Sequence, residues 1–202
     1  MMDKKVHKLL NQQINKEFYS AYLYLDFSNW FSSKGLDGFA NWYLIQAQEE
    51  RDHAMLFYKY LQNESQPVFL EAIAKPDKVF ENGMDVLKAG LEHEEYVTSL
   101  INDIYSAAEK VKDYRTMQFL DWFIKEQGEE ETNANGMISK MELFGSDPRS
   151  LYLLDKELPV YALLLLIQLH LMAYVLYQNQ HPLPSDFRYL QMKVFLFSPV
   201  LQ

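Results

Sequence analysis

The sequence predicts an all-α protein, a four-helix bundle with one long crossover connection. Apolar residues recur at spacings of three and four over four long stretches, which is the pattern of amphipathic helices. The chain has 202 residues but only seven glycines and seven prolines, too few for an all-β protein with many tight turns. Helix-ending signals divide the four stretches into two pairs, and the connection between the pairs is longer than those within them.

The first pair of helices is predicted before residue 64. Asp3 is a suitable N-cap for a helix that runs to about residue 33, where Gly35 provides a terminating residue. Asp37 can cap a second helix that runs to about residue 63. Because the connection between them is short, these helices should form an antiparallel hairpin.

The second pair follows a long connection over residues 64–82, which can cross the length of the bundle. The third helix is predicted from about residue 83 to about 110. Asp113 can cap a fourth helix, which ends near residue 144 before Gly145. The bundle domain therefore covers residues 1–145.

A short fifth helix is predicted over residues 146–158. Asp147 is an N-cap residue, and Pro148 follows it at the first helical position, where proline is favoured.

Each of the four long helices has an apolar seam that is interrupted near its middle by residues of metal-binding type. The interruptions are Glu17 in the first helix, Glu50 with His53 in the second, Glu94 in the third, and Gln127 with Glu130 in the fourth. Burying an unpaired charge costs several kcal/mol, so a core position normally rejects carboxylates. Antiparallel packing of helices of similar length brings their midpoints to one level. The sequence therefore predicts a cation site inside the bundle.

The spacing of these residues suggests two ions. Glu50 and His53 are three residues apart and share a helix face, so they can bind one ion together. Glu50 is the expected bridge between the ions, with Glu17 and His53 completing one site. The second site would be completed by Glu94 and Glu130. The chain has no cysteine, so the ligands are oxygen and imidazole, which suits iron, manganese or zinc.

Two further residues are expected to act at this centre without being strong ligands. Gln127 is neutral and should hydrogen-bond a bound water. Tyr24 lies two turns after Glu17 on the same face, and it can hydrogen-bond the metal site or give an electron during oxidation.

A second acidic set consists of Glu49, Glu126 and Glu129, which lie one position off the seam. These residues predict a third, weaker cation site that shares Glu130. A solvated acidic helix face explains the set almost as well. His7 and His93 have no partner in register and are expected at the surface.

The overall charge restricts the classes of partner. The formal net charge is −9 at pH 7, which argues against nucleic-acid binding and suits a surface that collects cations. The N-terminal residues lack the apolar stretch of a secretory signal, so a cytoplasmic location is expected.

Four segments around the seam interruptions, and one near residue 155, resemble bacterial non-haem ferritins. They are INKEFYSAYLYL, QAQEERDHA, LEHEE, FIKEQGEEE and SLYLLDKEL, and the resemblance covers residues 1 to about 158. It implies a ferritin-like bundle that assembles into a cage of 24 identical subunits. It also implies a ferroxidase that oxidises Fe(II) with O₂ or peroxide at a dinuclear iron centre and stores Fe(III) as an oxyhydroxide mineral.

The resemblance also assigns ligands. It implies Glu17, Glu50 and His53 for the first iron and Glu50, Glu94 and Glu130 for the second. For a third iron it implies Glu49, Glu126, Glu129 and Glu130.

Related di-iron families fit less well. Bacterioferritins have a second Glu-x-x-His in the fourth helix, where this chain has residues 127–130 without histidine, and a haem-binding methionine where this chain has Asp52; haem is therefore not expected. Rubrerythrins need cysteine ligands. Two alternative functions remain open: another di-iron or manganese–iron carboxylate oxidase, and a membrane-linked bundle with no catalytic activity.

Residues 159–202 do not match the family, and only three of them are charged. Residues 160–177 form an apolar run of marginal length for a membrane span. A membrane anchor, a natural packing extension and a tail translated out of frame are the three interpretations. The abrupt change in composition favours the third, whereas a spanning helix on every subunit of a closed cage has no evident geometry. Such a tail should impair assembly or solubility.

Overall fold

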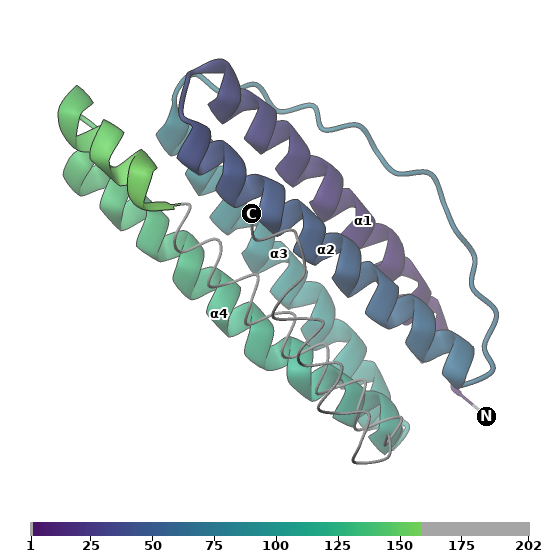
Figure 1. Cartoon of the computed structure of the whole chain (residues 1–202). Coiled ribbons are helices and arrows are strands. Elements are labelled where there is room, and N and C mark those ends of the chain that lie inside the picture. Colours follow the sequence, from purple (N-terminus) through teal and green to yellow (C-terminus); the bar gives the residue numbers. More distant parts are fainter. Residues whose placement is uncertain (1, 159–202) are drawn as a thin grey trace, which may run out of the picture. The chain divides into compact units, whose positions relative to one another are not determined.

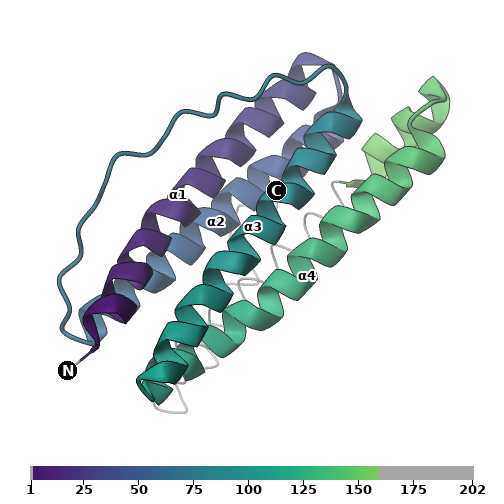
Figure 2. The same cartoon turned by 180° about the vertical axis from the view of Figure 1, so that it is seen from behind.

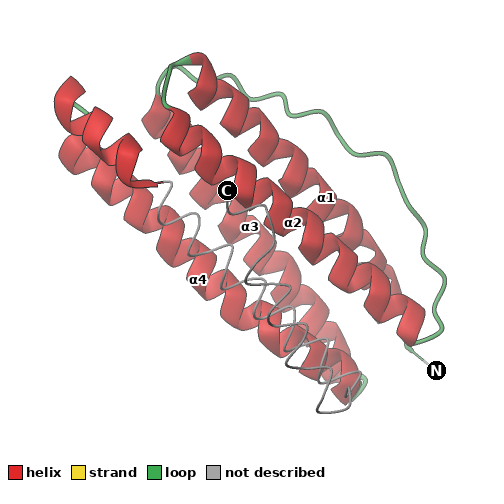
Figure 3. Cartoon of the chain, viewed as in Figure 1, coloured by secondary structure: helices red, strands yellow, loops and turns green. Residues whose placement is uncertain are grey.

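A computed structural model describes residues 2–158, in which four long helices are antiparallel partners in a bundle (Figures 1 and 3). The helices are α1 (Lys4–Ser33), α2 (Asp37–Asn63), α3 (Gly83–Lys110) and α4 (Tyr114–Phe144). Residues 148–158 are also helical, and there is no strand among the described residues. The predicted all-α class is confirmed. The predictions for residues 159–202 lie outside the described part of the chain.

The connectivity follows from the loop lengths. α1 packs against α2 and α3, and α3 packs against α4. The connection between Asn63 and Gly83 runs beside α1 from one end of the bundle to the other, as both views show (Figures 1 and 2). Side chains of α1 hold it there: the Asn11 amide donates to the Phe69 carbonyl at 2.8 Å and accepts from the Phe69 N–H at 2.8 Å. The predicted crossover is thus present.

Three of the predicted helix caps are formed. Asp3 Oδ1 accepts a hydrogen bond from the Lys5 N–H at 2.8 Å, and Asp113 Oδ1 accepts one from the Thr116 N–H at 3.2 Å. Asp147 Oδ2 accepts from the Ser150 N–H at 2.7 Å. Each of these bonds satisfies a donor that a helix start would otherwise leave without a partner.

The predicted cap at Asp37 is wrong. Leu36 is the N-cap residue of α2 and makes no side-chain cap bond. The free donors are instead satisfied by Asp155, whose Oδ1 accepts from Gly38 N–H at 2.8 Å and from Phe39 N–H at 3.1 Å. A Cβ atom on Gly38 would lie 1.7 Å from the Asp155 carbonyl oxygen, so this close approach requires glycine. Asp155 therefore fastens the helical segment 148–158 to the start of α2.

The apolar core is divided into two clusters, one toward each end of the bundle. One cluster contains Phe27, Phe31 and Phe39, and the other contains Leu10 and Ile101 among others. On every long helix, the residues between the two clusters include buried polar side chains. They are Glu17 and Ser20 on α1; Glu49, Glu50 and His53 on α2; Glu94 on α3; and Glu126, Gln127 and Glu130 on α4. The seam interruptions thus form one polar layer across the middle of the bundle.

Large aromatic side chains fill the space between α2 and α4 next to this layer. The Tyr60 and Phe119 rings stack with their centroids 4.1 Å apart, and the Phe57 and Phe123 rings are 4.3 Å apart. Such ring pairs bury large areas in a defined geometry. They hold the two helices at a fixed spacing on one side of the polar layer.

No helix among residues 2–158 combines the length and apolarity that a membrane span requires.

Candidate metal centre

The first half of the polar layer consists of Glu17 from α1 and Glu50 and His53 from α2. One ligand atom from each of the three lies within 4.8 Å of the other two. The three side chains are almost fully buried, with exposed fractions of 1%, 1% and 3%. Glu17 and Glu50 come from different helices, so the group exists only because α1 and α2 pack side by side.

Three atoms of this group have no hydrogen-bond partner among the described residues: Glu17 Oε2, Glu50 Oε2 and His53 Nε2. A buried polar atom without a partner is costly, and nearly all such atoms in folded proteins are satisfied. Two carboxylate oxygens and an imidazole nitrogen in close proximity are suitable ligands for a divalent transition metal. The residues present therefore fit a cation at this position.

The second half of the layer consists of Glu94 from α3 and Glu130 from α4. The Tyr24 hydroxyl donates to Glu94 Oε1, and Gln127 Nε2 donates to Glu94 Oε2 at 3.2 Å. Glu130 Oε2 accepts from Gln46 Nε2 at 3.1 Å. Each carboxylate is thus oriented by a neutral donor from a neighbouring position of the layer.

The two halves form one electrostatic cluster. Burial raises the pKa of Glu50 well above its ordinary value, and the negative charges of Glu94, Glu17 and Glu130 raise it further. Burial likewise raises the pKa of Glu130, with repulsion from Glu94 as the next cause. Tyr24 on α1 bonds Glu94 on α3, and Gln46 on α2 bonds Glu130 on α4, so side chains from all four helices meet in this layer.

The protonation states follow from burial. Burial raises the pKa of Glu17 from 4.5 to about 7, whereas it lowers the pKa of His53 from 6.5 to about 4. Without a cation, the buried carboxyls retain protons well above their usual range, and His53 is neutral near pH 7. Neutral imidazole is the metal-binding form, whereas the carboxyls must lose their protons, so metal and protons compete for this site.

Two aromatic side chains of α4 hold the His53 ring. Its centroid is 5.3 Å from the Trp122 ring and 5.7 Å from the Phe123 ring, both in edge-to-face geometry. These contacts restrict the imidazole to one orientation. The sequence does not indicate Trp122, because its position next to the core residue Phe123 gives no sign of contact with His53.

The outer acidic set is only partly buried. Glu49 and Glu126 are 2% and 4% exposed, and together with His53 they form a second group whose ligand atoms lie within 4.8 Å of one another. Burial raises the pKa of Glu126 to about 7. Glu129 is half-exposed and pairs with Lys125 at 3.1 Å. A solvated helix face therefore does not describe Glu49 and Glu126, whereas the role of Glu129 stays a prediction.

Two buried glutamines at the centre were not assigned a role from the sequence. Gln13 Nε2 donates to Glu17 Oε1 at 2.9 Å. Gln46 Nε2 donates to Glu130 and, at 3.3 Å, to Glu49 Oε2, which joins the inner and outer carboxylates. Each glutamine is four residues before a seam carboxylate on the same helix face, and this spacing is the signal that could have identified them. Gln127, expected to bond a water, donates to Glu94 and to Thr98 Oγ1.

The expectation of a surface position is wrong for His93. His93 is half-buried: its Nε2 lies 2.8 Å from Ser20 Oγ, and its ring contacts the Tyr24 ring edge-on at 5.9 Å. Burial lowers its pKa to about 4. His7 Nε2 lies 2.8 Å from the Pro67 carbonyl and helps hold the crossover connection. Helical register cannot show these partners, because they come from other elements.

Comparisons with known proteins show which family the chain resembles. Residues 7–144 match the family described as Ferritin-like domain. The chain is 39% identical over 163 residues to a bacterial non-heme ferritin of Campylobacter jejuni, covering 81% of this chain and 98% of that protein. It is 35% identical over 158 residues to a probable bacterial non-heme ferritin-like protein of Haemophilus influenzae, covering 78% and 96%. An open pore ferritin of Archaeoglobus fulgidus is similar in structure, with a TM-score of 0.76, 40% identity, and coverage of 78% of this chain and 98% of that chain.

Proposed function

The chain belongs to the ferritin-like domain family, and on this basis we propose that it is an iron-storage protein with ferroxidase activity. It oxidises Fe(II) with dioxygen or peroxide at the mid-bundle layer and stores Fe(III) as an oxyhydroxide mineral inside a cage of its own copies. The observation that carries this proposal is the set of unpartnered ligand atoms on Glu17, Glu50 and His53 in the buried polar layer. Fe(II) is here the substrate, and O₂ or peroxide is the oxidant.

We assign two iron positions. Glu17, Glu50 and His53 hold the first, and Glu50, Glu94 and Glu130 hold the second. Glu50 would be the bridge, because it belongs to the ligand group with Glu17 and His53 and the negative charges of Glu94 and Glu130 also raise its pKa. Gln13 donates to one oxygen of Glu17 and leaves the other without a partner. Tyr24 and Gln127 orient the two oxygens of Glu94, and Gln46 orients Glu130. A ligand held in this way loses little freedom when the ion binds.

The charge of the layer suits Fe(II) better than Fe(III). Two Fe(II) ions carry four positive charges, which the four carboxylates of Glu17, Glu50, Glu94 and Glu130 balance when deprotonated. Oxidation raises the total to six, and an unbalanced charge in a buried site is unfavourable. Each Fe(II) gives up one electron, and O₂ takes up two electrons and two protons to become hydrogen peroxide. The excess charge then favours hydrolysis and departure of Fe(III).

Glu49 and Glu126 offer the next position for a departing ion. They are buried, they share His53 as a neighbour, and Gln46 links Glu49 to Glu130. We therefore propose a third iron position at these two residues, with Glu129 at its edge and Glu130 in common with the dinuclear centre.

Assembly into a homo-oligomeric cage of 24 subunits is part of the proposal. The relatives named as ferritins and the surface of the subunit support it. Large apolar side chains are exposed on α1, on α2 and on the crossover connection, among them Leu25, Leu44 and Leu70, with exposed fractions of 44%, 51% and 69%. Apolar side chains of this size on several adjoining elements are typical of a subunit interface.

The test is aerobic addition of Fe(II) with stopped-flow absorbance of the Fe(III)–oxo band. Glu50→Ala removes the bridge and should slow the fast phase by about 100-fold or more, since even residues that only orient ligands contribute about 10–100-fold. The exposed Glu109→Ala on α3 is the matched control and should oxidise iron at the wild-type rate. Absence of oxidation in the wild type, or fast oxidation in Glu50→Ala, would falsify the ferroxidase assignment.

A further inference from the structure

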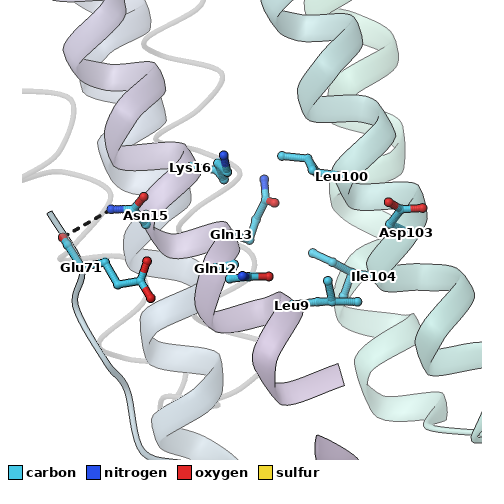
Figure 4. A pocket seen from close by; sticks show the side chains of 9 residues that line it. All are labelled: Leu9, Gln12, Gln13, Asn15, Lys16, Glu71, Leu100, Asp103 and Ile104. Carbon is cyan, nitrogen blue, oxygen red and sulfur yellow. Dashed lines mark hydrogen bonds between the residues drawn. The ribbon is translucent and has the colours of Figure 1, made fainter. Parts of the chain in front are cut away.

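A pocket of about 230 Å³ lies between α1 and α3 on the side where the crossover connection passes (Figure 4). Nine residues line it, from these two helices and the connection. Gln12, Glu71 and Asp103 are exposed and form its rim, whereas Gln13 and Ile104 are buried and form its floor. A volume of this size holds several water molecules. We call this cavity the α1–α3 pocket.

The floor of the α1–α3 pocket is one hydrogen bond away from the metal centre. Gln13 lines the pocket, is 2% exposed, and donates from Nε2 to Glu17 Oε1 at 2.9 Å. The other oxygen of Glu17 has no partner, and Glu17 belongs to the ligand group with Glu50 and His53. Figure 4 shows the Gln13 side chain between α1 and α3.

We propose that the α1–α3 pocket is the path by which Fe(II) reaches the dinuclear centre from solution, and that Gln13 is its gate. This inference rests on the proposed iron site. In the closed position the Gln13 amide covers Glu17. Rotation of that side chain breaks one hydrogen bond, frees Glu17 Oε1, and opens the floor toward the centre.

The residue type at position 13 suits a gate. Glutamine has several rotatable bonds and a polar end that can bond water or a hydrated cation as it turns. A leucine at this position would close the floor with apolar atoms and could not form a hydrogen bond with a hydrated ion. The amide of Gln13 can therefore bind an ion that passes. Burying this amide would be costly without its hydrogen bond to Glu17.

The rim of the α1–α3 pocket carries a net negative charge. The rim has two carboxylates, Glu71 and Asp103, and one ammonium, Lys16, whose Nζ lies 5.4 Å from the Tyr96 ring centroid. The net charge of the rim is thus about −1. A negative rim attracts cations, and salt reduces this attraction.

The experiment follows the binding of Co(II) to the purified full-length protein without oxygen, using the ligand-field absorbance of Co(II) in a stopped-flow instrument. Gln13→Leu and Gln13→Ala both remove the hydrogen bond to Glu17, but only leucine closes the floor. We expect Gln13→Leu to bind Co(II) at least about tenfold more slowly than Gln13→Ala, since closure adds a barrier comparable to a lost hydrogen bond. The final absorbance of the two variants should be equal.

Two charge variants at the rim provide a second measurement that does not depend on the fold around Gln13. Asp103→Asn should slow Co(II) binding and Lys16→Gln should accelerate it, each by about two- to fivefold at low salt, with both effects lost at high salt. Glu109→Gln, an exposed change on the same helix as Asp103, should leave the rate unchanged.

The outcomes separate the path from the site. Equal binding rates in the two Gln13 variants, together with unchanged rates in both rim variants, would overturn the path while leaving the iron site in place. A wild-type protein that binds no Co(II) would overturn the site itself and the path with it.

Discussion

The replacement of Glu17 by glutamine should stabilise the metal-free protein at high pH while abolishing one iron position. The carboxyl of Glu17 is fully buried and has one oxygen without a partner. Glutamine has nearly the same shape, can accept the same hydrogen bond from Gln13, and does not ionise. The change therefore isolates the cost of burying a charge.

The magnitude follows from the pKa of Glu17. In the folded protein burial raises it from 4.5 to about 7. The unfolded chain thus ionises from about pH 4.5 upward while the folded chain keeps its proton to about pH 7, so the wild type loses stability as the pH rises through this window. Each pH unit is worth about 1.4 kcal/mol, and the stability difference between the variant and the wild type should grow by about 2–3 kcal/mol from pH 5 to pH 8.

The assay is denaturant unfolding of both proteins with a chelator at pH 5 and pH 8, at one subunit concentration because assembly contributes to stability. The new amide group has a hydrogen without a partner, which lowers the free energy of unfolding of the variant by about 1 kcal/mol at both pH values. The change of the stability difference with pH is therefore diagnostic. At pH 8, saturating Co(II) should make the wild type more stable than the variant. A difference that is the same at both pH values would refute the reasoning.

Four further predictions concern protons, the outer site, the fold and the tail. Calorimetry should show that Co(II) affinity falls as the pH drops below about 7 and that binding releases protons, because protons compete for Glu17; a flat profile would contradict this. Glu129→Ala should change the turnover or the oxidant stoichiometry only mildly, and an unaltered time course of iron oxidation would speak against its part in a third site. Asp155→Ala should lower the free energy of unfolding by about 1–2 kcal/mol, the usual cost of losing a cap, whereas Ser150→Ala in the same segment should cost less. In size-exclusion chromatography, a chain stopped near residue 160 should assemble better than the full chain, and identical cages from both would contradict the expectation for the tail.

The long helices were predictable because their signals are local. Seam spacing and the caps at Asp3, Asp113 and Asp147 depend on residues within four positions of one another. The cap of α2 was not predictable: Asp155 lies more than a hundred residues from the donors that it satisfies. Asp37 is a good cap by residue type, but tertiary packing supplied a different acceptor.

The carboxylates of the polar layer were predictable for a different reason. A glutamate on an apolar seam conflicts with the rest of its helix, and such conflicts mark functional sites. The residues that orient these carboxylates create no such conflict. Gln13 and Gln46 are ordinary helix formers, whereas Tyr24 was predictable only from its place two turns after Glu17 on the same face.

The polar partners of His93 illustrate the same limit. Ser20 contacts it from α1 across the bundle, and neither residue shows a pattern along its own helix. Contacts between helices depend on the rotation of each helix about its axis, which a seam determines only to within about one position.

The dinuclear centre is tested most directly by a crystal structure of the protein soaked with Fe(II) without oxygen, with anomalous scattering measured at the iron edge. Two peaks per subunit are expected, one between Glu17, Glu50 and His53 and one between Glu50, Glu94 and Glu130, with Glu50 in contact with both. A single peak, or iron bound only at exposed carboxylates, would contradict the account.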